Sequence, residues 1–154
     1  MSETQSSENW TIGGGRSDAG VSAPVVGSQY FSSTSSEWQP TELKGFWMKP
    51  LFENRELGEK TMLMKVDAGA FAPSHNHDGE FEQIYVIEGS FYDQNGTMKA
   101  GDYCCRAPDA PHTSGSVDGA VVMLIYTKRE SGRHQSFDGC DGAGTNSPIV
   151  FCGR

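Results

Sequence analysis

The chain has 154 residues, which suits one domain, and its 36% content of apolar residues is low for a compact fold. Its formal net charge of −8 at pH 7 argues against nucleic acid as a partner, because polyanions would be repelled. The first ten residues lack the basic and apolar parts of a secretory signal, and the longest apolar run, residues 120–126, is too short to span a bilayer. We therefore expect a soluble, cytoplasmic protein with no membrane partner.

Polar residues and glycine are concentrated near both ends of the chain. Residues 1–36 are rich in Ser, Gly, Thr, Asn and Glu, and residues 131–147 in Gly, Ser and Asp. Such segments bury too little apolar surface to offset the entropy of ordering them. The sequence thus predicts a folded domain at 37–129, with segments 1–36 and 130–154 loose or laid over it.

The four cysteines match no zinc-ribbon or Cys-x-x-Cys spacing. Cys104 and Cys105 are adjacent and would point to opposite faces of a strand. A Cys140–Cys152 bridge could pin the tail, but a reducing cytosol disfavours it.

The first half of the domain has the pattern of short strands separated by turns. Residues 45–52 are apolar and aromatic, with Pro50 indicating an edge or a bend. Residues 53–60 predict a turn. Residues 61–67 mostly alternate, which places Met62, Met64 and Val66 on one face of a half-buried strand. Residues 68–78 contain Gly, Pro and polar turn formers, and predict a turn.

The second half continues in the same way. A strand over 81–87 is interrupted at Glu88-Gly89 and resumes at 90–92. Asn95-Gly96 predicts a hairpin, because this pair suits the positive-φ positions of a tight turn. The return strand covers 97–107 with a break at Gly101. A long polar loop follows at 108–119, and then a strand over 120–127 that should be covered on both faces.

No segment of useful length shows helical periodicity. Strands every eight to twelve residues with turns between them are typical of a sandwich or a closed barrel. Without helical crossovers the strands should pair antiparallel. The expected fold class is therefore all-β.

Three of the four histidines occur in two short windows. His75 and His77 stand two residues apart, on one face of an extended chain. Glu82 stands on the face of its strand that should turn toward the core. A carboxylate on that face is costly unless it is paired or metal-bound. His112 follows the return strand, in a loop that a hairpin-built barrel would bring back beside the first pair. Imidazoles with one carboxylate suit Fe, Mn, Ni, Co or Zn better than Ca or Mg, although surface histidines remain an open alternative.

The spacing Gly69-x5-His75-x-His77-x4-Glu82-x6-Gly89 is similar to the first sequence motif of the cupin family at every position. The second cupin motif is only partly present. Gly101 and His112 have the usual separation, but three positions depart from the pattern. Ala107 stands where the pattern has Pro (Pro108 is displaced by one), Asp109 where it has Gly, and Ser116 where Asn is common.

Residues 38–129 resemble small single-domain cupins. More narrowly, they are similar to the cupin domain of zinc-dependent anti-sigma factors and of related dioxygenases that cleave small ketones. The resemblance implies a jelly-roll barrel, frequent homodimers, and one metal near a mouth of the barrel. The metal ligands that it implies are His75, His77, Glu82 and His112. It does not imply a single reaction, because this fold carries many chemistries.

Charge counting favours an enzyme. Three neutral imidazoles and one carboxylate leave a divalent metal with a net charge of about +1 and, on an octahedral ion, two open positions. The leading hypothesis is an Fe(II) dioxygenase that acts on a small carbonyl or carboxylate compound. A metal-dependent lyase or isomerase would use the same site by polarising a carbonyl. A zinc sensor or regulatory module also stays open, since four ligands saturate tetrahedral zinc.

Several side chains are candidates for the substrate pocket. Tyr103 and Arg106 flank the second motif on opposite faces, so at most one of them looks inward, and Arg106 could hold a substrate carboxylate. His134 lies in the polar tail and should be a surface residue. The best inward candidates by parity are Met62, Met64, Ile84 and Val86.

Overall fold

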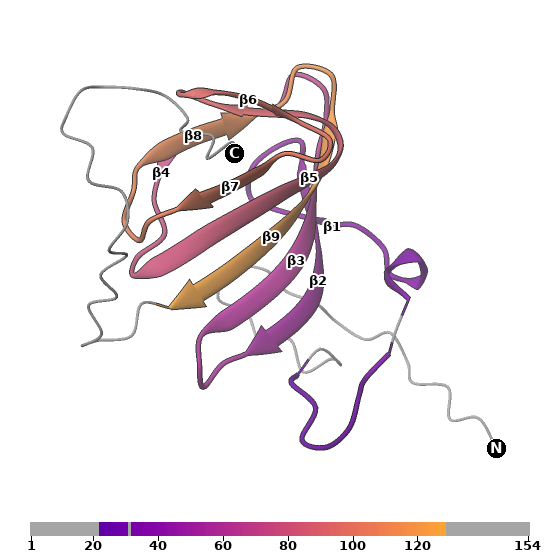
Figure 1. Cartoon of the computed structure of the whole chain (residues 1–154). Coiled ribbons are helices and arrows are strands. Elements are labelled where there is room, and N and C mark those ends of the chain that lie inside the picture. The colour runs from indigo at the N-terminus through magenta and orange to yellow at the C-terminus, as the bar shows by residue number, and fades with distance from the viewer. Residues whose placement is uncertain (1–21, 31, 129–154) are drawn as a thin grey trace, which may run out of the picture.

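The computed structural model describes residues 22–30 and 32–128. In these residues the chain forms one short 3-10 helix, η1 (Ser33–Ser35), and nine strands (Figure 1). The described residues contain no helix long and apolar enough to cross a membrane. The strands are β1 (Gln39–Pro40), β2 (Phe46–Asn54), β3 (Glu59–Val66), β4 (Phe71–His75), β5 (Glu80–Asp93), β6 (Gly96–Lys99), β7 (Tyr103–Arg106), β8 (His112–Gly115) and β9 (Ala120–Lys128).

Some sequence predictions concern residues outside the described ranges. They are the Cys140–Cys152 bridge, the surface position of His134 and most of the two terminal segments. In the described part, Cys104 is half-buried and Cys105 is exposed, as adjacent residues of one strand should be.

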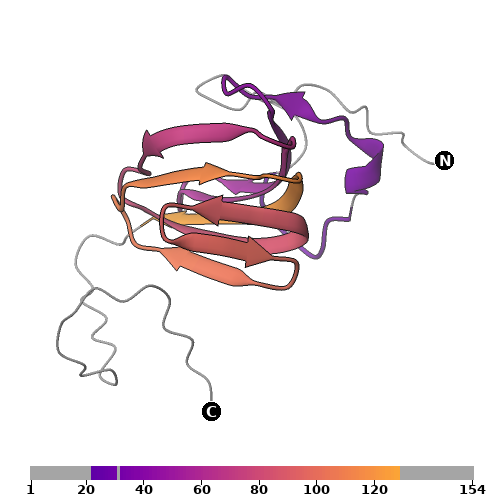
Figure 2. The same cartoon turned by 90° about the horizontal axis from the view of Figure 1, so that it is seen from above.

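The strands pair antiparallel in one curled sheet. Its order is β1-β2-β3-β9-β5-β8-β4, with β6 and β7 also paired to β5. Figure 1 shows β2, β3, β9 and β5 side by side, with β7, β8, β4 and β6 above them. Seen from above in Figure 2, the second group curls over the first. The all-β antiparallel barrel predicted from the sequence is therefore confirmed.

The long strand β5 joins the two parts of the sheet. Its first part pairs with β9 and β7, and its last four residues pair with β6. The change occurs beside a register shift between Val86 and Glu88, where Gly89 has a φ of 72°. The predicted interruption at Glu88-Gly89 is therefore wrong, because the bulge and the glycine let the strand bend and continue.

Two segments that the sequence predicts as turn and loop contain strands. Strand β4 lies within 68–78 and β8 within 108–119, and their register pairs His75 with His112. The strands have five and four residues, include Pro73 and pair with a register irregularity. Such short, irregular strands lack the regular alternation of apolar and polar residues by which a strand is recognised in a sequence. This pairing brings the two histidine windows together.

The hairpin at 93–96 forms, but by another mechanism than the predicted one. Asp93 pairs with Gly96, and neither Asn95 nor Gly96 has a positive φ. Instead, Asp93 Oδ1 accepts hydrogen bonds from the backbone N–H groups of Asn95 (2.7 Å) and Gly96 (3.1 Å). A side-chain turn of this kind explains why the positive-φ preference of Asn-Gly is not used.

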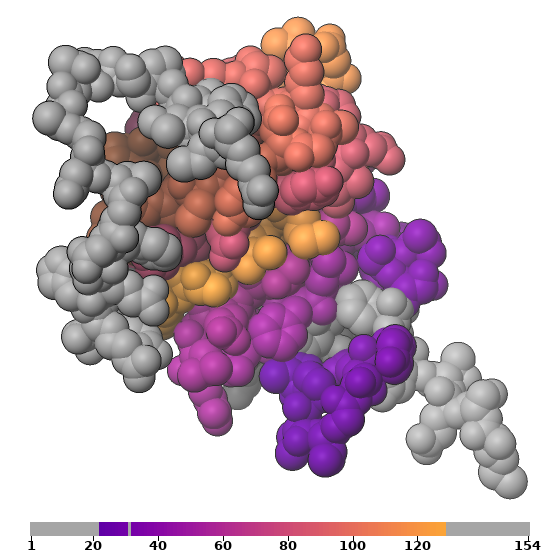
Figure 3. Space-filling model, in the orientation of Figure 1, coloured from indigo at the N-terminus to yellow at the C-terminus, as the bar shows by residue number. Residues whose placement is uncertain are grey.

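The barrel core follows the alternation of β3, β5 and β9. Strand β9 lies between β3 and β5, and its alternate residues are buried and half-buried. The prediction that it is covered on both faces is correct for the inner face only, because Val121, Met123 and Ile125 are half-buried outside. In the space-filling view, residues 22–30 lie beside β2 and β3 (Figure 3). The buried apolar residues are Phe46, Met62, Met64, Val66, Ala72, Ile84, Val86, Phe91, Ala120, Val122, Leu124 and Tyr126.

Candidate metal centre

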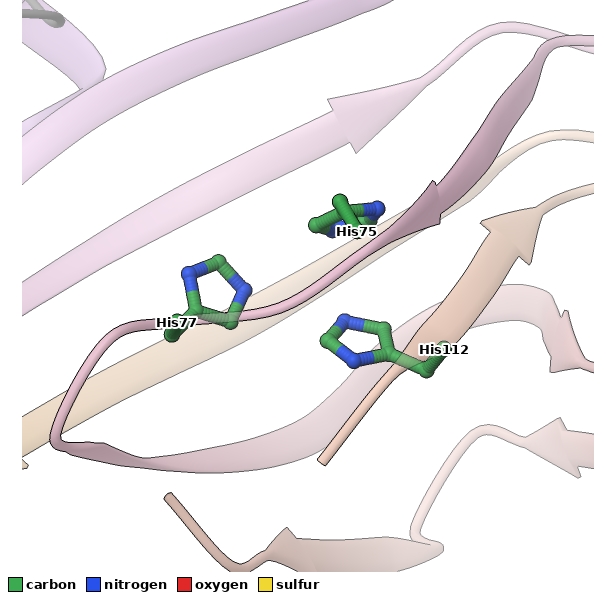
Figure 4. A group of neighbouring side chains, drawn as sticks. All are labelled: His75, His77 and His112. Atoms are coloured by element: carbon green, nitrogen blue, oxygen red, sulfur yellow. The ribbon is translucent and has the colours of Figure 1, made fainter. Parts of the chain in front are cut away.

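Three histidines from neighbouring segments face one another inside the curled sheet (Figure 4). His75 ends β4, His77 follows it in the turn to β5, and His112 begins β8. Their candidate ligand nitrogens all lie within 4.8 Å of one another. The ring centroids are 4.3 Å apart for His75 and His112, and 5.3 Å for His77 and either partner. The cluster is placed to hold one metal ion.

Backbone carbonyls fix the orientation of two of these rings. His75 Nδ1 lies 2.9 Å from the carbonyl oxygen of Pro73, and His112 Nδ1 lies 3.0 Å from that of Ala110. A carbonyl can only accept, so each Nδ1 donates and each Nε2 keeps a lone pair. Burial is the main influence that lowers the pKa of His112, which favours the neutral imidazole that a metal needs.

The third ring has an unsatisfied nitrogen. His77 Nε2 is buried and makes no well-formed hydrogen bond among the described residues, and the nearest acceptor is Glu82 Oε1 at 3.3 Å. A buried nitrogen of this kind costs free energy unless something binds it. With two further imidazole lone pairs beside it, the donor set fits a divalent transition metal.

Glu82 lies in the middle of a row of three strands. It is paired in register with Arg106 on β7 and with Tyr126 on β9. Its Oε1 accepts a 2.8 Å hydrogen bond from the Tyr126 hydroxyl and lies 3.3 Å from His77 Nε2. Its Oε2 lies 3.3 Å from His112 Nε2 and 3.4 Å from Arg106 Nη1.

The structure thus brings together all four residues that the sequence predicts as ligands. The group whose ligand atoms lie mutually within reach of one ion consists of the three histidines. Coordination by Glu82 stays a prediction. Its carboxylate contacts the edge of the histidine cluster through both oxygens.

Charges and hydrogen bonds keep Glu82 ionised. Burial alone would raise the pKa of Glu82, but the nearby His77, the Tyr126 hydroxyl and the Arg106 guanidinium outweigh it and lower that pKa. Burial and the charge of Glu82 raise the pKa of Tyr126 well above its usual value. The phenol therefore stays protonated at neutral pH and acts as a donor.

The hydroxyl of Tyr126 should make a measurable contribution to stability. Tyr126→Phe removes one donor from a buried carboxylate, so we expect the free energy of unfolding to fall by about 1.5–3 kcal/mol. Denaturant unfolding of the metal-free protein measures this. Tyr85→Phe is the matched control, because Tyr85 is 46% exposed on the same strand as Glu82. Equal stability of the Tyr126→Phe and Tyr85→Phe proteins would contradict the expectation.

The loop before His112 departs from the second motif, and at Asp109 it is held by contacts with the first histidine window. Asp109 has a φ of 65°, the left-handed conformation that glycine would adopt and that Asp tolerates. Its carboxylate accepts a 2.9 Å hydrogen bond from the Gly79 N–H, and its own N–H donates to the His77 carbonyl at 3.1 Å. Asp109 therefore ties the two histidine windows together. Ser116, at another of the three departures, is fully buried, and its hydroxyl donates to the Ser90 carbonyl.

A cavity of about 310 Å³ extends from the histidines through the barrel. Its walls are mainly apolar. The exposed Glu42 and Leu43 mark its opening, where the chain runs from β1 to β2. The residues lining the cavity are Thr41, Glu42, Leu43, Phe46, Met48, Met64, Ala72, His75, His77, Glu82, Ile84, Phe91, His112, Ser114, Leu124 and Tyr126.

The four apolar residues that parity predicts for the substrate pocket divide into two groups in the structure. Met64 and Ile84 line the cavity, whereas Met62 and Val86 are buried in the core away from it. Tyr103, also predicted for the pocket, does not line the cavity. Its side chain is 57% exposed, and its hydroxyl donates to Gln83, because its strand position faces outward.

Arg106 is the buried member of the flanking pair, and it contacts Glu82 rather than lining the cavity. The sequence reasoning missed Tyr126, although its parity with Val122 and Leu124 on β9 could have placed it inside. It also missed the opening formed by residues 41–43. No periodic signal marks that turn.

Comparison with known families gives one match for the sequence. The model of the family described as the ChrR cupin-like domain matches residues 27–131. None of the curated proteins matches the chain.

Several solved structures of differently named proteins have a similar fold. KdgF from Halomonas sp. is 20% identical with a TM-score of 0.59, over 68% of this chain and 96% of that one. A putative acetylacetone dioxygenase from Methylibium petroleiphilum PM1 is 19% identical with a TM-score of 0.60, over 68% and 80%. The anti-sigma ChrR of Rhodobacter sphaeroides, in complex with SigE, is 24% identical with a TM-score of 0.51, over 60% and 49%. At these identities the similarity shows the fold alone.

Proposed function

We propose that this chain, which belongs to the ChrR cupin-like domain family, is a metal-dependent dioxygenase that uses one Fe(II) ion to oxidise a small carbonyl compound. One observation carries the proposal. Three histidine side chains, two of them with Nδ1 held by a backbone carbonyl, face one another at the wall of an apolar cavity. A putative dioxygenase among the structures of similar fold is in keeping with it.

His75, His77 and His112 would hold the ion, with Glu82 as the predicted fourth ligand. When bound, iron supplies a Lewis acid and a redox centre with positions left open for substrate and O2. The protein contributes the orientation of the ligands. Carbonyl oxygens of Pro73 and Ala110 hold two imidazoles in the metal-binding tautomer.

The cavity favours an uncharged substrate. Among the described residues that line it there is no lysine or arginine, and the carboxylates are those of Glu42 and Glu82. A substrate carboxylate would meet no cation apart from the metal, and Glu42 at the opening would repel it. Phe46, Met64 and Leu124 instead offer apolar walls that exclude water and hold a short hydrocarbon group. We therefore expect a small ketone or diketone rather than a carboxylate compound.

Oxygen uptake tests this function. Protein loaded with Fe(II) under nitrogen should consume O2 with at least one compound from a panel of diketones and hydroxy-ketones, and thiol acids should give less uptake. The same protein loaded with Zn(II) should consume none, because zinc has no redox chemistry. Absence of uptake across the panel, or turnover that proceeds equally under nitrogen, would overturn the oxygenase in favour of a lyase or isomerase.

A zinc-containing regulatory module is the second candidate. The family description and the fold shared with the anti-sigma ChrR favour it. Four ligands would saturate a tetrahedral zinc ion and leave no position for a substrate. Purified protein that holds zinc firmly, and that cannot be loaded with iron after zinc removal, would support this candidate against the oxygenase.

A further inference from the structure

We propose that Asp93 and Arg106 form a positioning pair that fixes the carboxylate of Glu82 beside the three histidines. This inference rests on the proposed metal site and deepens it. Neither residue is a candidate ligand. Asp93 lies at the far end of β5, eleven positions from Glu82, and Arg106 ends β7.

Arg106 bridges two carboxylates inside the protein. Its Nη1 lies 3.4 Å from Glu82 Oε2, and its Nη2 donates to Asp93 Oδ2 in the shorter contact of the two. All three side chains are at least 90% buried. Water therefore screens these contacts little, and a guanidinium with five donors in a rigid fork is suited to hold both carboxylates at once.

Asp93 is itself anchored by the backbone. One of its oxygens accepts from the N–H groups of Asn95 and Gly96 in the hairpin turn, and the other faces Arg106. The position of the guanidinium is thus set by the β5–β6 hairpin rather than by a flexible side chain. Glu82 lies before the bend of β5 at Gly89 and Asp93 lies after it. The contacts of Arg106 with both carboxylates therefore link the two parts of the strand.

The same contacts exclude a direct role for Arg106 in binding substrate. Its side chain is 8% exposed, its guanidinium contacts both carboxylates, and it does not line the cavity. The sequence-based suggestion that it holds a substrate carboxylate is therefore not supported. Arg106 can therefore influence the site only through Glu82, whose two oxygens contact His77 and His112. Groups that orient metal-binding residues in this way typically alter metal affinity by about 10–100-fold.

The test uses Co(II) as a probe in the full-length chain, with affinity measured by chelator competition and coordination by visible absorption. Asp93→Asn removes the charge facing Arg106 and leaves one acceptor oxygen for two sets of donors. Arg106→Lys keeps the charge but loses the fork. We expect both variants to bind Co(II) at least about tenfold more weakly and to shift the absorption bands. Asp118→Asn, in the exposed turn before β9, is the matched control and should match wild type.

The outcomes separate this inference from the proposed function. If wild type binds Co(II) and both variants keep its affinity and spectrum, the positioning role is wrong and the metal site stands. If they lose thermal stability without any change in affinity or spectrum, Asp93 and Arg106 are merely structural, which also overturns it. If Asp93→Asn does not fold by circular dichroism, Arg106→Lys decides. If wild type binds no Co(II), the metal site itself is wrong.

Discussion

The His112→Ala protein is expected to carry less than about a tenth of the metal found in wild type, which we expect to hold about one ion per chain. His112 is 3% exposed, so bulk water does not solvate its ring. The Ala110 carbonyl holds its Nδ1, which leaves Nε2 as the nitrogen that can bind a metal. Alanine removes a preoriented ligand that no described neighbour can replace. Elemental analysis of protein purified anaerobically, without a metal-binding tag, measures the content.

The other histidines of the cluster and one outside it provide the comparison. His75→Ala and His77→Ala should lose metal to a similar extent. His134→Ala should retain it, because that residue was predicted from the sequence to be an ordinary surface histidine, although it lies outside the described range. Stoichiometric metal in the His77→Ala/His112→Ala double variant would refute the site. Iron as the metal lost would support oxygen chemistry, and zinc would support the regulatory alternative.

Gly89→Ala is expected to lower the free energy of unfolding by about 3 kcal/mol or more, and the melting temperature by roughly 10 °C or more. Gly89 has a φ of 72°, where an alanine is strained. A Cβ there would also lie 2.0 Å from the carbonyl oxygen of Gly119, a backbone atom directly before β9. Thermal and denaturant unfolding of the variant measure the loss.

Gly101→Ala separates the two causes. Gly101 has a φ of 93°, but a Cβ there would meet nothing within 4 Å. This variant carries the backbone strain without the collision and should cost about 1–2 kcal/mol. If Gly89→Ala is no worse than Gly101→Ala, the close approach of Gly119 does not determine the need for glycine at the end of the first motif.

The strands with strong alternation and the members of the histidine cluster could be predicted from the sequence. Met62, Met64 and Val66 are buried as their period of two indicates, and the spacing of His75, His77 and Glu82 matched a motif specific enough to find the cluster. The all-β fold class followed from evenly spaced turns and the absence of helical periodicity, and the jelly-roll barrel from the resemblance to cupins. These features are local, so a single sequence contains them.

The remaining features depend on contacts between distant residues. Strands β4 and β8 exist because they pair with each other, and neither has a local pattern of its own. The row of Arg106, Glu82 and Tyr126 depends on the register of three strands, which parity alone does not fix. The role of Asp109 could not be read either, because an aspartate at a glycine position looks like a defect until its φ and its contact with Gly79 are known.

Strand β4 ends the sheet and pairs only with β8 among the described strands, through three register pairs. Such an edge has the least protection against local opening. Two of the histidines stand on these two strands, so an ion that binds His75 and His112 closes the edge from inside. By mass action, the free metal concentration would then set how often this edge opens, and we expect loaded and empty protein to differ in local hydrogen exchange before they differ in fold.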